Sequence, residues 1–269
     1  MSLNIAKVTS AVLALAVGLS TTAPLAFAQS NAKASVRVVH ASPDAPAVDI
    51  YINDRETLSN LSFKRVTAYT ALDAGTYTVK VFPTSANGQG NPALQTQVTL
   101  NPGWDYTIAA VGKLESIQAR VISDNLNVPG AGKTKVRAYH FSPNAPSVNV
   151  GVKDGSTLVR GLAFPNATDY LTVDSGRYNL VVQNASNNEQ VLEIPNANLA
   201  SNAVQSVFVF GLVGENPALS QVVTTDRKAA GTPATGAEDS MLFMILAAGL
   251  VGSAGIMLKK MASVEERIR

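Results

Sequence analysis

The sequence of 269 residues contains no cysteine, two histidines and one tryptophan. Without cysteine the chain has no disulfide, no thiol nucleophile, no cysteine-based metal site and no lipoprotein anchor. Charged residues make up only 15%, below the roughly 25% of average soluble domains. The net charge of +2 gives no broad basic field for nucleic acid. Calcium loops of the D-x-D-x-D-G type and phosphate-binding glycine-rich loops are also missing, so we predict no cofactor.

The middle of the chain is rich in Val, Thr, Ser, Asn, Gly and Pro, as expected for strands joined by turns. Apolar residues there recur with a period of two, as where Val36, Val38 and His40 alternate with Arg37 and Val39. No run supports a long amphipathic helix, although residues 58–63 and 196–202 are compatible with a turn or a short helix. This pattern predicts an all-β sandwich or barrel.

A segment of the chain is repeated at an offset of 100 residues. Residues 36–50 read VRVVHASPDAPAVDI, and residues 136–150 read VRAYHFSPNAPSVNV. The duplication predicts two tandem domains with about seven strands each, separated by a segment rich in Pro and Gly. The predicted segments are a signal peptide at 1–28, β-sandwich domains at 33–124 and 135–226, linkers at 125–134 and 227–240, a transmembrane helix at 241–258 and a cytoplasmic tail at 259–269.

A D-x-G-x-Y stretch enters a strand in both copies, ending at Tyr77 and at Tyr178. It resembles the tyrosine corner of immunoglobulin-like antiparallel β-sandwiches, in which the tyrosine hydroxyl bonds to the backbone upstream. The alternative makes Asp73 a catalytic or calcium-binding residue, but the chemistry of the turn already explains an aspartate there. Trp104 follows Asn-Pro-Gly and fits the start of a strand that packs at a domain edge. Stacking of its ring on a sugar or another ligand is the alternative.

The V-x-H-x-S-P-x-A-P-x-V-D-[IV] opening and the later A-G-x-Y turn resemble the bacterial domain-of-unknown-function 4397 family. The resemblance covers both copies, from about Ala34 to Thr225. The second copy departs from the first at Asn144 and Asn149, where the first has aspartates. The resemblance implies an exported or surface-anchored bacterial protein and brings no established activity.

The two histidines occupy equivalent positions at the end of the first strand of each copy. A zinc site needs three or four nearby ligands, and each copy offers one histidine and no cysteine. A His40–Ser42–Asp44 triad is also disfavoured, because an extended chain places His40 and Asp44 about 13 Å apart. We therefore interpret the repeated loop as structural, with ligand binding and catalysis as alternatives, and predict no catalytic or metal-binding residue. The loop residues are His40, Ser42, Asp44, His140, Ser142 and Asn144.

The N-terminus reads as a secretory signal peptide. Lys7 precedes the apolar run AVLALAVGL, and Ala26-Phe27-Ala28 forms an A-x-A cleavage site. We predict cleavage between Ala28 and Gln29. The alternative is an uncleaved membrane anchor, for which the apolar run is short.

The C-terminus contains an uncharged run at 241–258, preceded by acidic residues and followed by two lysines. At about 1.5 Å per residue the run reaches about 27 Å, near the thickness of the bilayer core. The lysines place the tail in the cytoplasm. This end resembles a Leu-Pro-x-Thr-Gly cell-wall sorting signal, which implies that a sortase cuts between Thr235 and Gly236 and joins the chain to peptidoglycan. The matching segment is Thr232, Pro233, Ala234, Thr235 and Gly236, with Thr232 in place of leucine; a plain single-pass anchor is the alternative.

These features together predict a non-enzymatic protein at the outer face of a bacterial cell, held by the cell wall or the membrane. Display or adhesion through binding of an extracellular protein or glycan is the first hypothesis. A structural spacer of the envelope is the second. A surface hydrolase or metal-dependent enzyme centred on His40 is the third.

Overall fold

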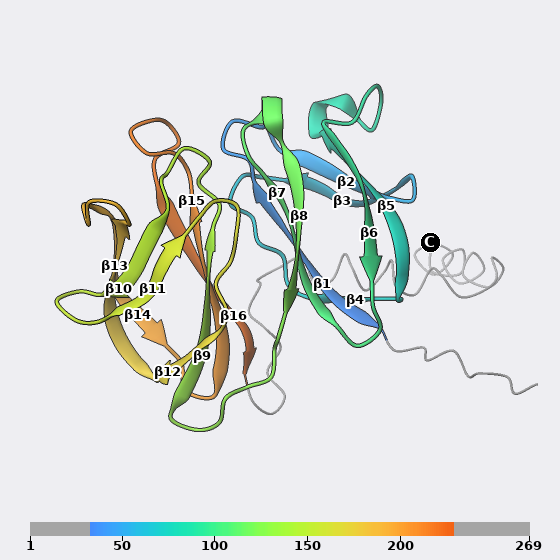
Figure 1. Ribbon diagram of the computed structural model, residues 1–269. Coiled ribbons are helices and arrows are strands. Elements are labelled where there is room, and N and C mark those ends of the chain that lie inside the picture. Colours follow the sequence, from blue (N-terminus) through green and yellow to red (C-terminus); the bar gives the residue numbers. More distant parts are fainter. Residues whose placement is uncertain (1–32, 229–269) are drawn as a thin grey trace, which may run out of the picture. The chain divides into compact units, whose positions relative to one another are not determined.

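The computed structural model describes residues 33–228 of the chain (Figure 1). The predicted signal peptide, the sorting motif at 232–236, the predicted membrane helix at 241–258 and the tail at 259–269 lie outside the described residues. Between residues 33 and 228, no helix has the length and apolar character needed to cross a bilayer.

Strands dominate the described residues, which contain two short 3-10 helices and no α-helix. The first repeat consists of β1 (Ala34–Ala41), β2 (Val48–Ile52), β3 (Arg55–Leu61), β4 (Thr70–Leu72), β5 (Gly75–Pro83), η1 (Thr84–Ala86), β6 (Leu94–Leu100), β7 (Asp105–Val111), η2 (Leu114–Ser116) and β8 (Gln118–Asp124). The second repeat consists of β9 (Lys133–His140), β10 (Val148–Val152), β11 (Thr157–Leu162), β12 (Leu171–Asp174), β13 (Gly176–Asn184), β14 (Gln190–Leu199), β15 (Ala203–Phe210) and β16 (Ser220–Lys228). The predicted all-β class is confirmed.

The strands form four four-stranded sheets, two in each repeat. In the first repeat the sheet β3-β2-β5-β6 packs on β4-β1-β7-β8, and in the second β11-β10-β13-β14 packs on β12-β9-β15-β16. We call the sheets that contain β1 and β9 the inner sheets, and the other two the outer sheets. The prediction of two β-sandwiches is confirmed, but each has eight strands where about seven were expected.

The expectation of purely antiparallel sheets is wrong at one place in each repeat. Strand β1 pairs in parallel with β7, and β9 pairs in parallel with β15. Parallel strands are usually buried on both faces, and β1, β7 and β15 are buried at most of their residues, whereas β9 is buried mainly in its second half. All eight residues of β15 are buried. Burial on both faces explains why β1 and β15 carry apolar side chains on both sides of the strand.

The segments at 58–63 and 196–202, which we expected to be compatible with a short helix, belong mainly to strands β3 and β14. Each contains an asparagine with left-handed backbone, Asn60 at φ 54° and Asn196 at φ 53°. The register of β3 on β2 shifts at this point, and so does that of β14 on β13. The sequence signal for a turn therefore marks irregularities within strands.

Three clusters of buried side chains stabilise the fold. Two of them fill the interior of one sandwich each. The third, which we call the inter-repeat cluster, joins the two inner sheets. Its buried members are Val39, Ala41, Ala109, Val111, Tyr139, Phe141, Phe208 and Phe210. The two repeats are therefore packed on each other, and residues 33–228 belong to one compact unit.

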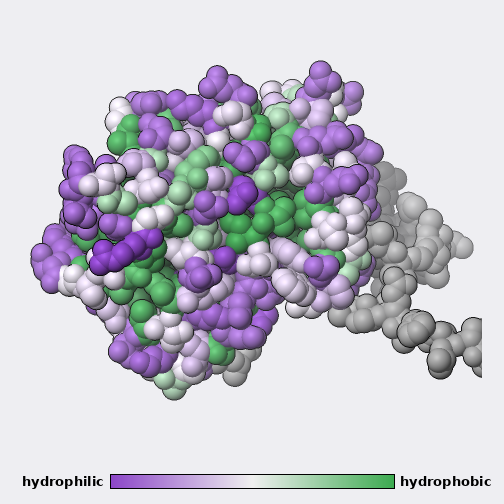
Figure 2. Space-filling view, viewed as in Figure 1, coloured by the Kyte–Doolittle hydropathy of each residue, from purple (hydrophilic) through white to green (hydrophobic). Residues whose placement is uncertain are grey.

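Polar and apolar side chains share the part of the surface that faces the viewer in Figure 2. Figure 2 shows one face of the molecule, on which hydrophobic areas are interrupted by hydrophilic side chains. The large hydrophobic side chains that are exposed on the described residues are Trp104, Leu114, Val121, Val213 and Val223. Among these, Trp104 is the most exposed, at 52%.

Candidate functional site

The two histidines have the same hydrogen bonds in both repeats. Nε2 of His40 donates to the carbonyl of Pro46 at 3.0 Å, and Nδ1 accepts from the amide of Ser42 at 3.4 Å. His140 makes the same bonds to Pro146 and Ser142, at the same distances. Since both ring nitrogens already have a backbone partner, neither histidine offers a free lone pair to a metal ion or a substrate.

Burial also sets the charge of these rings. His40 is 0% exposed and His140 is 1% exposed. Burial lowers the pKa of both imidazoles, and the bonds to the proline carbonyls only partly oppose this effect. Both histidines are therefore neutral at physiological pH. These hydrogen bonds tie each imidazole to the Ser-Pro-x-Ala-Pro loop that follows it.

Ser42 and Asp44 lie beside His40 but do not form a triad with it. The Ser42 hydroxyl donates to Asp44 at 3.4 Å, whereas its amide, and not its hydroxyl, contacts the imidazole. The carboxylate of Asp44 accepts the amide of Leu114 at 2.8 Å. Within residues 33–228, no group of three or more potential His, Asp or Glu metal ligands comes together.

Asn144 has the role in the second repeat that Asp44 has in the first. Its side-chain oxygen accepts the amide of Val213 at 2.8 Å, and its nitrogen donates to the Val213 carbonyl at 3.0 Å. Asp44 ties the repeated loop to the segment after β7, and Asn144 ties it to the segment after β15. This shared acceptor role explains why aspartate and asparagine exchange here. The Ser142 hydroxyl, in contrast, is buried without a hydrogen-bond partner.

The tyrosine corner occurs in both repeats. The Tyr77 hydroxyl donates to the carbonyl of Asp73 at 2.7 Å, and the Tyr178 hydroxyl donates to that of Asp174 at 2.9 Å. The carboxylate of Asp73 pairs with Lys33 at 2.8 Å on the surface. Asp73 is thus explained by the turn and by an exposed ion pair.

A buried arginine connects the repeats. Arg37 in β1 is 1% exposed, and its guanidinium donates to Asp226 in β16 at 2.7 Å. It also donates to Thr107 at 2.7 Å, to Ser206 at 2.9 Å and to Tyr139 at 3.0 Å. Burial opposes the charge of Arg37, but its electrostatic interactions with Asp226, Tyr69, Tyr139 and Asp124 overcome this effect and raise its pKa. The group is therefore a charged and fully bonded link between the inner sheets.

A second ion pair joins the repeats, but here the second repeat supplies the arginine and the first repeat supplies the aspartate. Arg137 in β9 donates to Asp124, the last residue of β8, at 2.9 Å. The Asp124 carboxylate also accepts from Tyr69 at 2.7 Å and from Tyr139 at 2.6 Å. Each repeat thus supplies one arginine and one aspartate to the other, as in an isologous dimer interface.

An open polar groove lies beside this interface. It has a volume of about 400 Å³, within the range of 300–1,000 Å³ typical of ligand sites. We call it the Trp104 groove, and its lining includes Trp104, Asp105, Ser123, Asn125, Asn127 and Tyr170.

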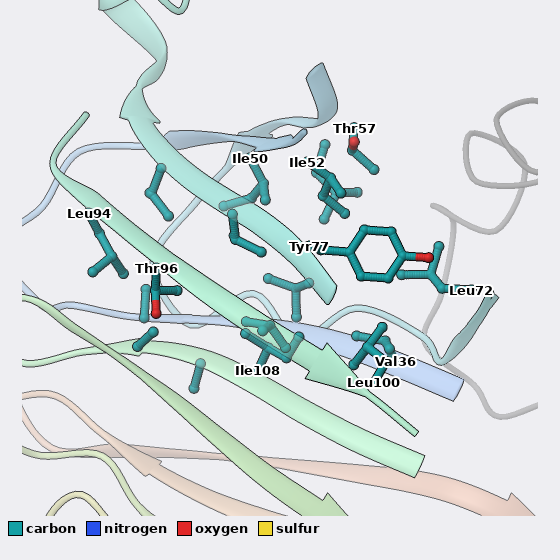
Figure 3. A pocket seen from close by; sticks show the side chains of 18 residues that line it. Val36, Ile50, Ile52, Thr57, Leu72, Tyr77, Leu94, Thr96, Leu100 and Ile108 are labelled. Carbon is teal, nitrogen blue, oxygen red and sulfur yellow. The ribbon is translucent and has the colours of Figure 1, made fainter. Parts of the chain in front are cut away.

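Each sandwich also has an apolar space between its two sheets, but these spaces are small. Figure 3 shows the one in the first repeat, where Ile50, Leu94 and Ile108 point inward and the Tyr77 ring lies beside Leu72. Its volume is about 50 Å³, and the equivalent space in the second repeat measures about 40 Å³. These are packing voids that hold no more than a very small molecule. The Trp104 groove is therefore the candidate site.

The family expected from the repeated motif is also found by comparison. Residues 34–151 and 152–238 match the profile of a family described as a domain of unknown function, DUF4397. The chain belongs to the DUF4397 family. The two matched segments confirm the tandem duplication. The boundary between the two matched segments, after residue 151, lies just after the repeated motif of the second copy at 136–150. The second sandwich begins earlier, with β9 at Lys133.

No curated protein matches this DUF4397 chain. Among solved structures, it is similar to a family 26 carbohydrate-binding module of Amy13K from Eubacterium rectale, in complex with maltoheptaose, at 13% identity. This match covers 74% of the chain and 98% of the module, with a TM-score of 0.24. A candidate adhesin from Bacteroides ovatus is 11% identical over 77% of the chain and 96% of the adhesin, with a TM-score of 0.22. At such TM-scores these likenesses carry no argument about function.

The neutral histidines of this DUF4397 protein lead to a prediction about pH. An unfolded histidine takes up a proton near pH 6.5, whereas His40 and His140 resist protonation in the folded state. The unfolded state then binds more protons, so stability falls as the pH drops through about 6.5. We expect a loss of up to about 1.4 kcal/mol per histidine between pH 7.5 and 5.5, measured by urea unfolding.

The control is the double variant His40→Gln/His140→Gln, in which neither site titrates. It should lose most of the pH dependence in this window, whatever its stability at pH 7.5. An unchanged pH dependence in the double variant would contradict the neutral state of the two rings.

Proposed function

We propose that this DUF4397 protein is a non-enzymatic binding protein, exported from a bacterial cell and held at the outer face of its envelope. The observation that carries the binding function is the Trp104 groove, which combines a ligand-sized volume with a half-exposed aromatic side chain. The geometry of His40 argues against a surface hydrolase, because a ring without solvent access and without a free nitrogen has no means of activating water.

The proposed location depends on the two ends of the sequence. Cleavage between Ala28 and Gln29 would release the N-terminus outside the membrane. The apolar run at 241–258 and the following lysines would hold the other end, either as a membrane anchor or until a sortase cuts after Thr235. The cell-wall partner in the second case is peptidoglycan.

A structural spacer is the second candidate function. The reciprocal pairs Arg37–Asp226 and Arg137–Asp124 favour it, because they fix the inner sheets against each other without any hinge. A spacer needs such rigidity but has no need of an exposed tryptophan in a groove. Ligand binding by the purified protein separates the two candidates.

Mass spectrometry of the C-terminal peptide tests the proposed location. The protein is recovered separately from muramidase-released wall material and from membranes. We expect a wall-derived peptide that ends at Thr235 and carries a peptidoglycan fragment, together with an N-terminus at Gln29.

Intact protein through Arg269 in the membrane fraction alone would overturn sorting and leave a single-pass anchor. Protein found only in the cytoplasmic fraction, with Met1 retained, would overturn export itself and with it the proposed function at the cell surface. As a control, a Thr235→Ala/Gly236→Ala variant should shift the protein from the wall to the membrane.

A further inference from the structure

The Trp104 side chain is not required by the fold, as the second repeat demonstrates. Ser35 pairs with Asp105 in the first repeat, and its equivalent Lys135 pairs with Val204 in the second. The position of Trp104 therefore corresponds to Ala203, which is completely buried. The same strand start is built without an aromatic residue and without a carboxylate. Trp104 and Asp105 thus form a local feature of the first repeat that packing does not explain.

Trp104 is held as a rigid platform. Its ring stacks on that of Tyr106, with centroids 6.3 Å apart and an interplanar angle of 19°. Tyr106 is buried, and its hydroxyl accepts the amide of Asn101 at 3.1 Å. The Tyr106 ring thus covers one side of the indole, while about half of the Trp104 surface remains open to solvent. An aromatic ring fixed in this way loses little conformational entropy when a ligand stacks on it.

The polar side of the groove is also organised in advance. Lys135 donates to the carbonyls of Asn125 at 2.8 Å and Asn127 at 3.3 Å. The amide of Asn127 bonds to the Asn125 side chain at 3.1 Å, and the Asn125 amide donates to the Tyr170 hydroxyl at 3.4 Å. These bonds fix the segment after β8 in one conformation, and both asparagines remain exposed.

The acidic group of the groove is fixed as well. The Asp105 carboxylate accepts bonds from the Leu126 backbone and the Ser35 hydroxyl, and its partial burial raises its pKa. No lysine or arginine side chain belongs to the lining of the groove. Arg227 acts electrostatically on the Asp105 carboxylate from outside the lining, so an anionic ligand meets the carboxylates of Asp105 and Asp124 but no cationic side chain within the groove. The hydroxyl groups of a neutral ligand meet acceptors and amides at suitable positions.

From this arrangement we infer that the Trp104 groove binds a neutral polysaccharide, with the apolar face of one sugar ring on Trp104 and the hydroxyl groups on Asp105, Asn125 and Asn127. A pyranose ring has C–H groups on its faces and hydroxyls around its rim, which matches an aromatic platform with short polar side chains beside it. The open form of the groove suits one part of a long chain. This inference rests on the proposed binding function and specifies its ligand.

Affinity electrophoresis of the purified protein tests this site. Native gels contain amylopectin, galactomannan, xyloglucan or dextran as neutral polymers, and polygalacturonate as the anionic one. We expect at least one neutral polymer to retard the wild-type protein, and polygalacturonate to have no effect. Trp104→Ala should weaken the binding about tenfold or more, as expected for removal of a central aromatic contact. Trp104→Tyr should retain most of the binding.

Two further variants separate the groove from the rest of the surface. Asn127→Ala removes an exposed amide of the groove and should weaken binding several-fold, whereas Leu114→Ala removes an exposed apolar residue that is not part of the lining and should have no effect. Ala203 at the equivalent position indicates that Trp104→Ala folds, and an unchanged melting temperature verifies this.

Retardation that Trp104→Ala leaves unchanged would overturn the groove as the site but not the binding function. Absence of retardation by every neutral polymer, or selective retardation by polygalacturonate, would overturn the polysaccharide inference. Binding of a proline-rich peptide such as decaproline at Trp104, in place of the polymers, would overturn it also. None of these results affects the location at the cell surface, which mass spectrometry tests separately.

Discussion

Replacing Arg37 by Met is expected to lower the free energy of unfolding by about 3–5 kcal/mol, because the variant leaves the buried carboxylate of Asp226 without its partner. Both side chains of this pair are 1% exposed, so water does not replace the lost interaction. Because methionine fills most of the space of the arginine stem, the loss of stability arises more from the missing charge than from a cavity. Urea unfolding followed by circular dichroism measures the difference.

Two controls accompany this variant. Arg37→Met/Asp226→Leu removes both charges and should recover a large part of the lost stability, since a buried ion pair exchanges with apolar residues at little cost. Lys33→Met breaks the exposed pair with Asp73, whose side chains are 49% and 61% exposed, and should cost no more than about 1 kcal/mol. An Arg37→Met variant as stable as Lys33→Met would contradict the buried link between the inner sheets.

Replacing Phe208 by Ala is expected to cost about 3–5 kcal/mol, as for other fully buried phenylalanines. Phe208 lies at the centre of the inter-repeat cluster, with its ring stacked on that of Tyr139 at 4.4 Å and on that of Phe210 at 5.8 Å. It is 0% exposed, and the guanidinium of Arg37 lies 4.9 Å from its ring centroid. The substitution therefore leaves a cavity between the inner sheets and removes a cation–π contact. Urea unfolding again provides the measurement.

The matched control is Val121→Ala in β8, which truncates a side chain that is 42% exposed. It should change the stability by less than about 0.5 kcal/mol. If Phe208→Ala had an equally small effect, the packing of the two repeats on each other would be refuted.

The sequence predicted the parts of the fold that depend on local chemistry. The alternation of apolar residues and the repeated motif led to two β-sandwiches, and the D-x-G-x-Y stretch led to the tyrosine corner at Tyr77 and Tyr178. These features depend on residues that lie near each other in the chain. The parallel pairing of β1 with β7 was missed, because it joins segments about 70 residues apart and has no local signal.

The interface was missed for a similar reason, although a signal was present. Arg37 and Arg137 occupy the same position of the repeated motif, each between apolar residues of the first strand. A repeated arginine flanked by apolar residues in the first strand indicates a buried cation, but the sequence did not reveal that its partner is the aspartate of the other repeat. For the groove, the corresponding signal was the presence of Trp104 in the first repeat where the second repeat has Ala203. It required the register of β7 and β15, which only the structure provides.

The central claim of this account is that the two repeats form one body, whose shared interface lies beside the Trp104 groove. Differential scanning calorimetry of the mature protein tests it most directly. The account predicts one transition with equal calorimetric and van't Hoff enthalpies, shifted as a whole to lower temperature by Phe208→Ala. Two resolved transitions, of which only the one from the second repeat responds to Phe208→Ala, would contradict it.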